Sequence, residues 1–568
     1  MTKKIAGDYE LPLHLFHQGN NFESYRFFGC HEGEKNGKKG HFFRVWAPNA
    51  KGVSLVGDFN NWDETADPLE KIADTEVWEI FKTGLKQFDT YKYAIDGCDG
   101  KLHMKADPYG THMEVKPSTG SKVFKSAYKW TDDEWQEKKK QTDVYKSPMN
   151  IYEVHFNSWK QCTEGKYFSY PNFAKSIIPY LKEMSYTHIE FMPLAEFPFD
   201  GSWGYQGIGY YAPSSRYGTP DDFKAMIDLF HNAGISVILD WVPAHFPKDE
   251  AGLYEFDGGC VYEYDDPKKR DHLAWGTRVF DYGKNEVVSF LVSNALYWIE
   301  QYHVDGLRVD AVASMLYLDY GKRDGEWVAN IYGGNENLEA VEMLKHLNSI
   351  NKKLKTGALM IAEESTAWPK VTGELSDDGL GFDYKWNMGW MNDFTEFMRY
   401  DPYFRGQHYG ELTFSMIYAY SERFMLIFSH DEVVHGKATM IGKMPGERKD
   451  KFANLRAAYG YMFTHPGKLL SFMGQDLAEF DEWNEKREIE WDLLQYDEHR
   501  CFNTYIKDLL HFYKMHPALY ELDKDHDSDD FKTPCSGPSA ASDEHHDQYH
   551  QLADLGPDLK VGYGIACG

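Results

Sequence analysis

The sequence contains few cysteines for its length, and no arrangement of them suggests pairing. Seven occur in 568 residues: Cys30, Cys98, Cys162, Cys260, Cys501, Cys535 and Cys567. An odd number at wide spacing, with no Cys-x-x-Cys, argues against a disulfide framework and indicates no structural zinc site. Reduced thiols are typical of the cytosol, so we expect a cytoplasmic protein.

Basic charge and long apolar runs are also scarce. The formal net charge is −28, whereas proteins that bind nucleic acid or anionic membranes need basic surfaces. The first residues, MTKKIAGDYE, lead into Pro12, His14 and His17 rather than into the apolar core of a signal peptide. No run approaches the length of a transmembrane helix. We therefore expect neither a nucleic-acid partner nor a membrane partner.

Aromatic residues are plentiful, at 16% of the chain. Flat rings suit the apolar faces of sugars, but a large and well-packed enzyme gives the same fraction. A neutral polymer would need no charge match with so acidic a protein. Composition alone therefore leaves both interpretations open.

Four apolar, strand-like runs in the middle of the chain each end in acidic or imidazole side chains. The runs cover residues 236–239, 307–309, 358–362 and 424–429. They lead into Asp240 and His245, into Asp310, into Glu363, and into His430 and Asp431. In a (β/α)8 barrel the active site lies at the carboxyl ends of the strands, and paired carboxylates with a supporting Arg and His suggest glycoside chemistry.

Arg308 and Asp310 alternate with apolar residues and therefore share one face of a strand. A neighbouring Arg favours the ionised carboxylate, which a nucleophilic Asp requires, so we predict a lowered pKa for Asp310. Taken alone, this fragment fits an exposed ion pair at the edge of a strand better than it fits a catalytic pair. The other three runs favour the catalytic interpretation.

Helical and strand-like patterns alternate around these runs. Phe173, Ile177, Leu181 and Met184 recur at helical spacing before an apolar run at 187–194. Thr219 and Pro220 mark the start of another helix, which Gly234 ends. Further strands are expected at 150–155, 381–387 and 468–473. Eight strands separated by helices predict an α/β fold with a closed (β/α)8 TIM barrel.

The sequence pattern before the barrel predicts β-strands and no helices. Strand-like runs at 42–46, 53–56 and 91–95 are separated by turn residues, which predicts a small immunoglobulin-like sandwich. Residues 129–147 read as a polar connector. We therefore divide the chain into a sandwich module at 1–145, a catalytic barrel at 146–515 and an irregular segment at 516–568.

The four runs resemble the signature regions of the α-amylase superfamily, in the form typical of glycogen branching enzymes: DWVPAHFPKD, DGLRVDAVASMLYLDY, AEESTAWP and SHDEVVHGK. FRVWAPNA, VGDFNNWD and YKYAIDG resemble the glycan-binding β-sandwich module that precedes the barrel in branching and debranching enzymes. Trp62 in this module either contacts polysaccharide or packs the sandwich against the barrel. The resemblance extends over roughly residues 12–520, which is too long and too ordered for chance.

The resemblance implies the function and the roles of the site residues. It implies a 1,4-α-glucan branching enzyme that acts on glycogen or amylose as donor and acceptor, without cofactor or metal, and as a monomer. Asp310 is the expected nucleophile, Glu363 the acid/base, with a raised pKa, and Asp431 the third carboxylate. The expected substrate-binding residues are Tyr205, Asp240, His245, Arg308 and His430. The family has a β-domain after its barrel, and we expect that domain to be truncated here because residues 523–568 are polar and aperiodic.

Two other functions remain open at this stage. A debranching or trehalose-releasing hydrolase shares the plan of sandwich and barrel. A catalytically silent glycan-binding protein is the second alternative, against which the presence of every catalytic carboxylate counts.

Overall fold

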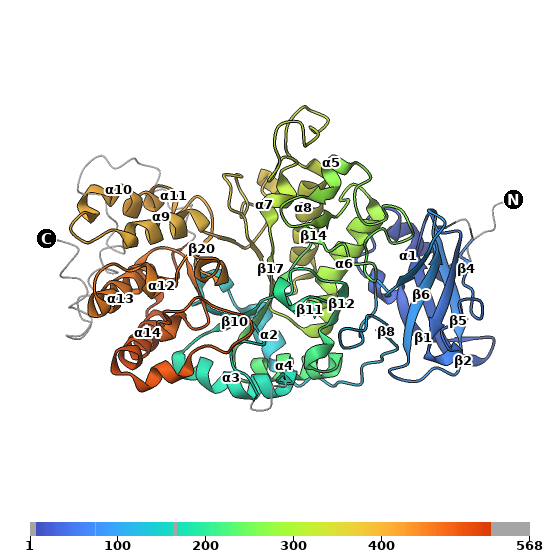
Figure 1. Cartoon of the computed structure of the whole chain (residues 1–568), viewed down its shortest axis with the longest axis horizontal. Helices are drawn as coiled ribbons and strands as arrows, with labels where there is room; N and C mark the ends of the chain where they lie inside the picture. Colours follow the sequence, from blue (N-terminus) through green and yellow to red (C-terminus); the bar gives the residue numbers. More distant parts are fainter. Residues whose placement is uncertain (1–6, 74, 163–166, 524–568) are drawn as a thin grey trace.

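A closed barrel of eight parallel strands forms the centre of the molecule (Figure 1). The computed structural model describes residues 7–73, 75–162 and 167–523. The barrel strands are β9 (Asn150–Val154), β10 (His188–Phe191), β13 (Ser236–Trp241), β17 (Gly306–Val309), β18 (Leu359–Ala362), β19 (Tyr384–Trp386), β20 (Phe424–Phe428) and β21 (Lys468–Phe472). They pair in this order, and β21 closes onto β9. The predicted (β/α)8 barrel is confirmed.

Helices cover the outside of the barrel. They include α3 (Tyr170–Met184), α4 (Pro220–Asn232), α6 (Asn285–Tyr302), α8 (Leu338–Leu354), α9 (Met388–Arg399), α13 (Arg448–Thr464) and α14 (Asp497–Met515). The predicted start of α4 is correct in detail: the Asp222 amide donates to the Thr219 hydroxyl at 3.2 Å, and the Thr219 amide donates to the Asp222 carboxylate at 2.8 Å. This reciprocal cap satisfies amides that the first helical turn leaves unpaired.

The strand register brings the functional residues to one edge of the barrel. Asp240 on β13 is in register with Arg308 on β17, and Arg308 is in register with Ile361 on β18. Asp310 and Glu363 follow the last residues of β17 and β18. Because all eight strands are parallel, the residues that follow them meet at the carboxyl end.

The amino-terminal residues form a sandwich of two sheets at one end of the molecule (Figure 1). One sheet contains β1 (Gly29–Lys35), β2 (Lys38–Trp46), β5 (Val77–Lys82) and β4 (Glu70–Lys71). The other contains β3 (Gly52–Gly57), β6 (Thr90–Asp96), β7 (Leu102–Lys105) and β8 (Ser121–Lys122). Trp62 is 37% exposed and donates to Asp58, which favours a surface role over packing against the barrel.

The sandwich is joined to the barrel by part-buried polar contacts. Asp257, in the long loop after β13, accepts a hydrogen bond from the Asn49 amide at 2.7 Å. Lys105 on β7 donates to the Tyr254 carbonyl in the same loop at 2.7 Å. The long loop therefore serves as the junction between the two units as well as part of the barrel rim.

The expected polar connector at 129–147 contains a helix, α2 (Asp133–Gln141), so that prediction is wrong for these residues. Acidic residues in its first turn and lysines in its last turn suit the helix dipole. Trp135 and Lys139 both contact the buried Asp305, at 3.0 and 3.2 Å. Because Asp305 directly precedes β17, α2 lies at the amino end of the barrel.

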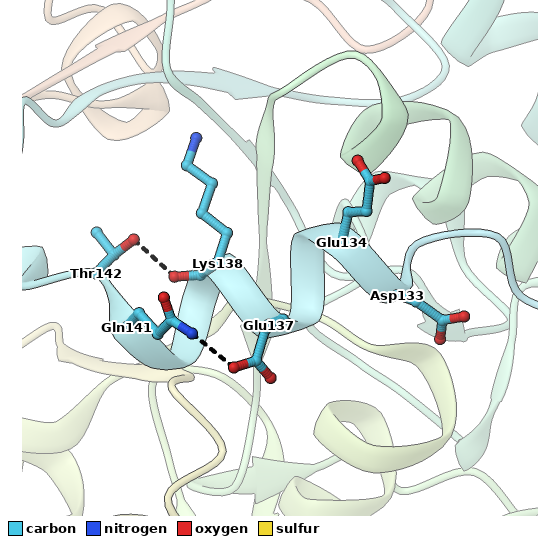
Figure 2. A pocket seen from close by; sticks show the side chains of 6 residues that line it. All are labelled: Asp133, Glu134, Glu137, Lys138, Gln141 and Thr142. Carbon is cyan, nitrogen blue, oxygen red and sulfur yellow. Dashed lines mark hydrogen bonds between the residues drawn. The ribbon is translucent and has the colours of Figure 1, made fainter.

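The outer face of α2 carries an open polar pocket (Figure 2). Six residues of this one segment line it: Asp133, Glu134, Glu137, Lys138, Gln141 and Thr142. Gln141 donates to Glu137 at 2.6 Å, and Thr142 donates to the Lys138 carbonyl at 2.8 Å. These are ordinary helix-surface contacts at the end of the barrel opposite the catalytic-type residues, so the pocket offers no chemistry.

The carboxyl-terminal prediction falls mostly outside the described residues. Within residues 516–523 the structure shows one 3-10 turn, Pro517–Leu519. The expected truncated β-domain lies beyond them. In the described ranges no helix is both long and apolar enough for a membrane span.

Candidate active site

Arg308 on β17 forms the centre of a charged cluster. Its guanidinium donates to Asp240 at 2.7 Å and to Asp310 at 2.8 Å, and it lies 2.9 Å from the Glu363 carboxylate. The side chain is buried, and its guanidinium lies 4.2 Å from the centre of the Trp386 ring. A planar guanidinium offers several donors in a fixed geometry, so one residue orients three carboxylates from neighbouring strands.

A second cation, His430, lies at the end of β20. Its Nδ1 is 2.5 Å from a Glu153 oxygen, and its amide donates to the other Glu153 oxygen at 2.9 Å. Tyr205 stacks on the His430 ring at 5.7 Å and donates its hydroxyl to Asp240 at 2.6 Å. Tyr205 therefore links the His430 pair to the Arg308 cluster.

The backbone after β17 holds Glu363 in place. Ala311 has a positive φ of 52°, a conformation that is rare for a residue with a side chain. Its amide donates to the Glu363 carboxylate at 2.8 Å, and the Val312 amide donates to the Glu363 carbonyl at 3.0 Å. Backbone strain of this kind concentrates at functional sites, where the surrounding structure maintains it.

His245 and Asp431 complete the group. The His245 Nε2 lies 3.9 Å from Asp310 Oδ2, the carboxylate oxygen that Arg308 does not contact. Asp431 Oδ1 lies 3.6 Å from the His430 Nε2. The structure thus brings all eight predicted residues together at the carboxyl end of the barrel: Tyr205, Asp240, His245, Arg308, Asp310, Glu363, His430 and Asp431.

The electrostatics correct one prediction. Burial raises the pKa of Asp310, Arg308 lowers it, and Glu363 and Asp240 raise it again, so the pKa lies well above its usual range. Burial likewise raises the pKa of Asp240, to about 6, against the opposing effect of Arg308. The predicted lowering for Asp310 is wrong because burial outweighs the effect of Arg308, whose guanidinium is also shared among three carboxylates. The burial of these carboxylates and their mutual repulsion therefore favour protonation within the cluster.

The pKa values of His430, Asp431 and His245 shift in different directions because their surroundings differ. Burial lowers the pKa of His430, but Glu153 and Asp431 raise it, to about 9, so the imidazole is charged at neutral pH. Burial raises the pKa of Asp431, and His430 and Arg308 bring it below its usual value. Burial lowers the pKa of His245 to about 3, so this imidazole is neutral and can donate one hydrogen bond and accept another.

Two buried carboxylates in the barrel interior were not predicted. Glu153 on β9 pairs with His430, and Glu190 on β10 is in register with it. Glu190 is fully buried, and neither of its carboxyl oxygens has a hydrogen-bond partner among the described residues. In the sequence, each of these carboxylates is marked only as the single acid within a short apolar run: Glu153 in IYEVH and Glu190 in HIEF.

Glu364 faces away from the cluster, as expected for a residue adjacent to Glu363. It is buried, accepts from Lys385 at 2.6 Å and accepts from the Thr366 amide at 2.7 Å. It therefore supports the loop after β18. Across the described ranges, no three His, Cys, Asp or Glu side chains are grouped so as to hold a metal ion.

Comparison with known proteins gives the class first. Residues 27–110 match carbohydrate-binding module 48 (isoamylase N-terminal domain), and residues 175–279 match the α-amylase catalytic domain. The fold is also that of a putative α-amylase from Salmonella typhimurium, with a TM-score of 0.65 and 21% identity over 87% of each chain. The fold and the site define a carbohydrate-active enzyme of the α-amylase class.

Closer relatives identify the family. The chain is 53% identical to the 1,4-alpha-glucan branching enzyme GlgB of Butyrivibrio fibrisolvens, over 90% of this chain and 81% of that protein. It is 52% identical to GlgB of Oceanobacillus iheyensis, over 90% of this chain and 80% of the relative. The chain belongs to the GlgB family of 1,4-alpha-glucan branching enzymes. The prediction of a branching enzyme of the α-amylase superfamily is confirmed.

Proposed function

We propose that this site cleaves an α-1,4 linkage of a glucan chain and transfers the chain to a 6-hydroxyl, with Asp310 as nucleophile and Glu363 as acid/base. The observation that supports this assignment is the contact of one guanidinium, Arg308, with both carboxylates. A retaining mechanism needs two carboxyl groups held close together on opposite sides of the reacting bond. The contacts with Arg308 hold the two carboxylates close to each other.

In the first step Asp310 Oδ2 attacks the anomeric carbon, and the bond to the glycosidic oxygen breaks. The other oxygen, Oδ1, is held by Arg308, so Oδ2 is the one free to react. Glu363 gives its proton to the leaving oxygen, which departs as a free 4-hydroxyl. Protonation within the carboxylate cluster suits this role.

In the second step the 6-hydroxyl of another glucan attacks the same carbon. Glu363, now ionised, takes the hydroxyl proton, and the ester to Asp310 breaks to restore the carboxylate. Tyr205, Asp240, His245, His430 and Asp431 surround the position of the reacting sugar and supply its stacking surface and hydrogen bonds. The His430 charge, maintained by Glu153, makes that residue a strong donor.

The proposed partners and organisation follow from the same assignment. The donor and acceptor are α-glucans such as amylose and glycogen. Residues 1–145 form a glucan-binding module and residues 146–515 the catalytic unit, in a monomeric, cytoplasmic enzyme. The exposed Trp62 offers a ring to polysaccharide on the sandwich surface.

Trapping of the covalent intermediate tests the assignment. A 5-fluoro glycosyl fluoride of an α-glucan oligosaccharide forms a glycosyl-enzyme that turns over slowly. Peptide mapping by mass spectrometry should place the sugar on Asp310. A label on another residue, or no label with a competent donor, would overturn the proposed roles.

A debranching or other hydrolase is the main rival, and product analysis separates the two. A branching enzyme lowers the iodine absorbance of amylose without releasing reducing sugars, whereas a hydrolase produces reducing ends in step with that loss. A catalytically silent binding protein changes neither quantity.

A further inference from the structure

A hairpin beside the site presents an exposed tryptophan. β15 (Asp271–His272) and β16 (Thr277–Val279) pair in antiparallel fashion, and the turn between them contains Trp275. β16 also pairs with β14 (His245–Phe246), with His245 opposite Val279. The hairpin is therefore attached through its backbone to the strand that carries His245, which places the turn at the rim of the site.

Trp275 packs on two histidines of this small sheet. Its ring lies 5.1 Å from the His245 ring and 4.5 Å from the His272 ring. His245 Nδ1 and His272 Nε2 are buried without hydrogen-bond partners among the described residues. The indole nevertheless remains 39% exposed.

A second ring extends the surface toward the acid/base. Tyr320, in the loop between α7 (Val312–Leu316) and α8, lies 6.1 Å from Trp275 and is half-buried. After burial, the main influence that raises the Tyr320 pKa is the charge of Glu363, followed by that of Asp310. The backbone geometry agrees: the Tyr320 amide donates to the Tyr317 carbonyl at 3.3 Å, and the Tyr317 ring lies 5.4 Å from the Trp368 ring in the loop after Glu363. Tyr320 is thus on the Glu363 side of the cluster. Because Glu363 acts on the leaving and attacking oxygens, this side faces the part of the substrate beyond the cleaved bond.

We infer that Trp275 and Tyr320 form a stacking platform for the acceptor glucan, and that Trp275 determines how well transfer to a 6-hydroxyl competes with hydrolysis. The inference rests on the proposed function. It adds a substrate-positioning role to the turn with Trp275, which lies outside the four signature regions, and to Tyr320, the last residue of the second region. The two rings offer apolar faces to successive sugars without fixing a charge, which suits a neutral polymer.

An acceptor platform has a specific consequence for the intermediate. Water is present at tens of molar, so a glycosyl-enzyme is transferred only when the acceptor is held in position near the anomeric carbon. A bound chain also excludes water from the site. Loss of the platform should therefore lower the share of the glycosyl-enzyme that is transferred to glucan rather than to water. It should have a smaller effect on the rate at which the glycosyl-enzyme forms.

The test compares two readouts in Trp275→Ala, Trp275→Phe and Tyr332→Ala. Tyr332 is 83% exposed in the same loop as Tyr320 and serves as the matched control. The first readout is the fluoride burst from α-maltotriosyl fluoride, which needs no acceptor. The second is the ratio of α-1,6 linkages to new reducing ends formed from amylose, with the apparent KM for the acceptor chain.

Trp275→Ala should lower the ratio of transfer to hydrolysis about tenfold and raise the acceptor KM, while the fluoride burst falls no more than about twofold. Trp275→Phe should retain most of the ratio because it retains a ring, and Tyr332→Ala should match the unmodified protein. Equal losses in burst and transfer would overturn the inference in favour of a general structural role, as would an unchanged ratio.

The same data separate this inference from the proposed function. If the unmodified protein forms no α-1,6 linkages from amylose, the proposed function fails whatever Trp275 does. If it forms them and Trp275→Ala keeps the same ratio with a normal thermal unfolding curve, only the acceptor platform fails.

Discussion

At the scale of single residues, the central feature is one guanidinium shared among three carboxylates. Arg308 contacts Asp240, Asp310 and Glu363 within 2.9 Å. This single cation does not offset the burial of Asp240 and Asp310, so the pKa values of both carboxyls are raised. The raised pKa of Asp310 favours protonation within the cluster. In the proposed mechanism this proton is on Glu363 when a sugar oxygen approaches, which leaves Asp310 ionised as the nucleophile.

The proposed roles predict large kinetic effects from small changes. Asp310→Asn and Glu363→Gln should each lower the rate of α-1,6 linkage formation on the order of 10⁴-fold, because each removes a group that reacts. Neither removes apolar packing, so circular dichroism should stay the same. Near-normal activity in either variant would refute the assignment. Asp265→Asn, at an acidic side chain that is 81% exposed, is the control.

The Glu153–His430 pair predicts a pH-dependent stability. The pKa of His430 is about 9 in the folded protein and about 6.5 in an unfolded chain. The pair therefore stabilises fully below pH 6.5 and loses this contribution as the pH rises through 9, on the order of 3 kcal/mol for a shift of this size. Urea unfolding should show this decline in the unmodified protein.

Glu153→Gln is the matched variant for that measurement. It keeps the shape and removes the charge that raises the His430 pKa, so the difference in unfolding free energy between the two proteins should shrink as the pH rises from 6 to 9.5. A difference that stays constant over this range would show that His430 is not charged by Glu153.

The sequence predicted the residues at strand ends better than those within strands. Asp310, Glu363 and His430 follow apolar runs, so their common location follows from the parallel barrel alone. Glu153 and Glu190 lie inside such runs, and a single sequence does not show which face of a short strand points into the barrel. The pKa of Asp310 was predicted in the wrong direction because its burial, and the number of carboxylates around Arg308, depend on the three-dimensional structure.

At the scale of secondary-structure elements, the strands and the caps were predictable from local signals. All eight barrel strands lie within a residue or a few of their expected positions, since apolar runs of this length bounded by turns have few alternatives. Helix α2 was missed because it has no apolar stripe. Its position depends on long-range contacts of Trp135 and Lys139 with Asp305, which the sequence does not reveal.

The cap of α4 gives a prediction at this scale. Thr219→Ala removes the hydroxyl that accepts from the Asp222 amide, and the free energy of unfolding should fall by about 1 kcal/mol. Thr219→Ser keeps the hydroxyl and should lose much less. Branching activity should be the same in both. A loss of stability as large in the Ser variant would show that the cap is not the cause.

At the scale of the whole molecule, the loop after β13 connects the sandwich to the barrel. Asp257 is fully buried at this junction, and the Asn49 amide donates to it. Asp257→Ala removes the charged acceptor of this part-buried hydrogen bond, at a cost of roughly 1.5–3 kcal/mol. We expect a lower thermal midpoint by calorimetry, with the sandwich and barrel transitions moving apart. Asp265→Ala, at an exposed position in the same loop, should leave the curve unchanged; equal effects of the two would contradict this role.

The account as a whole depends on the fate of the glycosyl group on Asp310, and one measurement addresses it directly. Amylose is incubated with the protein, the anomeric region is followed by proton NMR, and reducing ends are counted in the same samples. The account predicts that α-1,6 signal rises as α-1,4 signal falls, with almost no new reducing ends. New reducing ends in step with the lost α-1,4 linkages would contradict it, because they would show that water, rather than a second glucan, takes the chain from the enzyme.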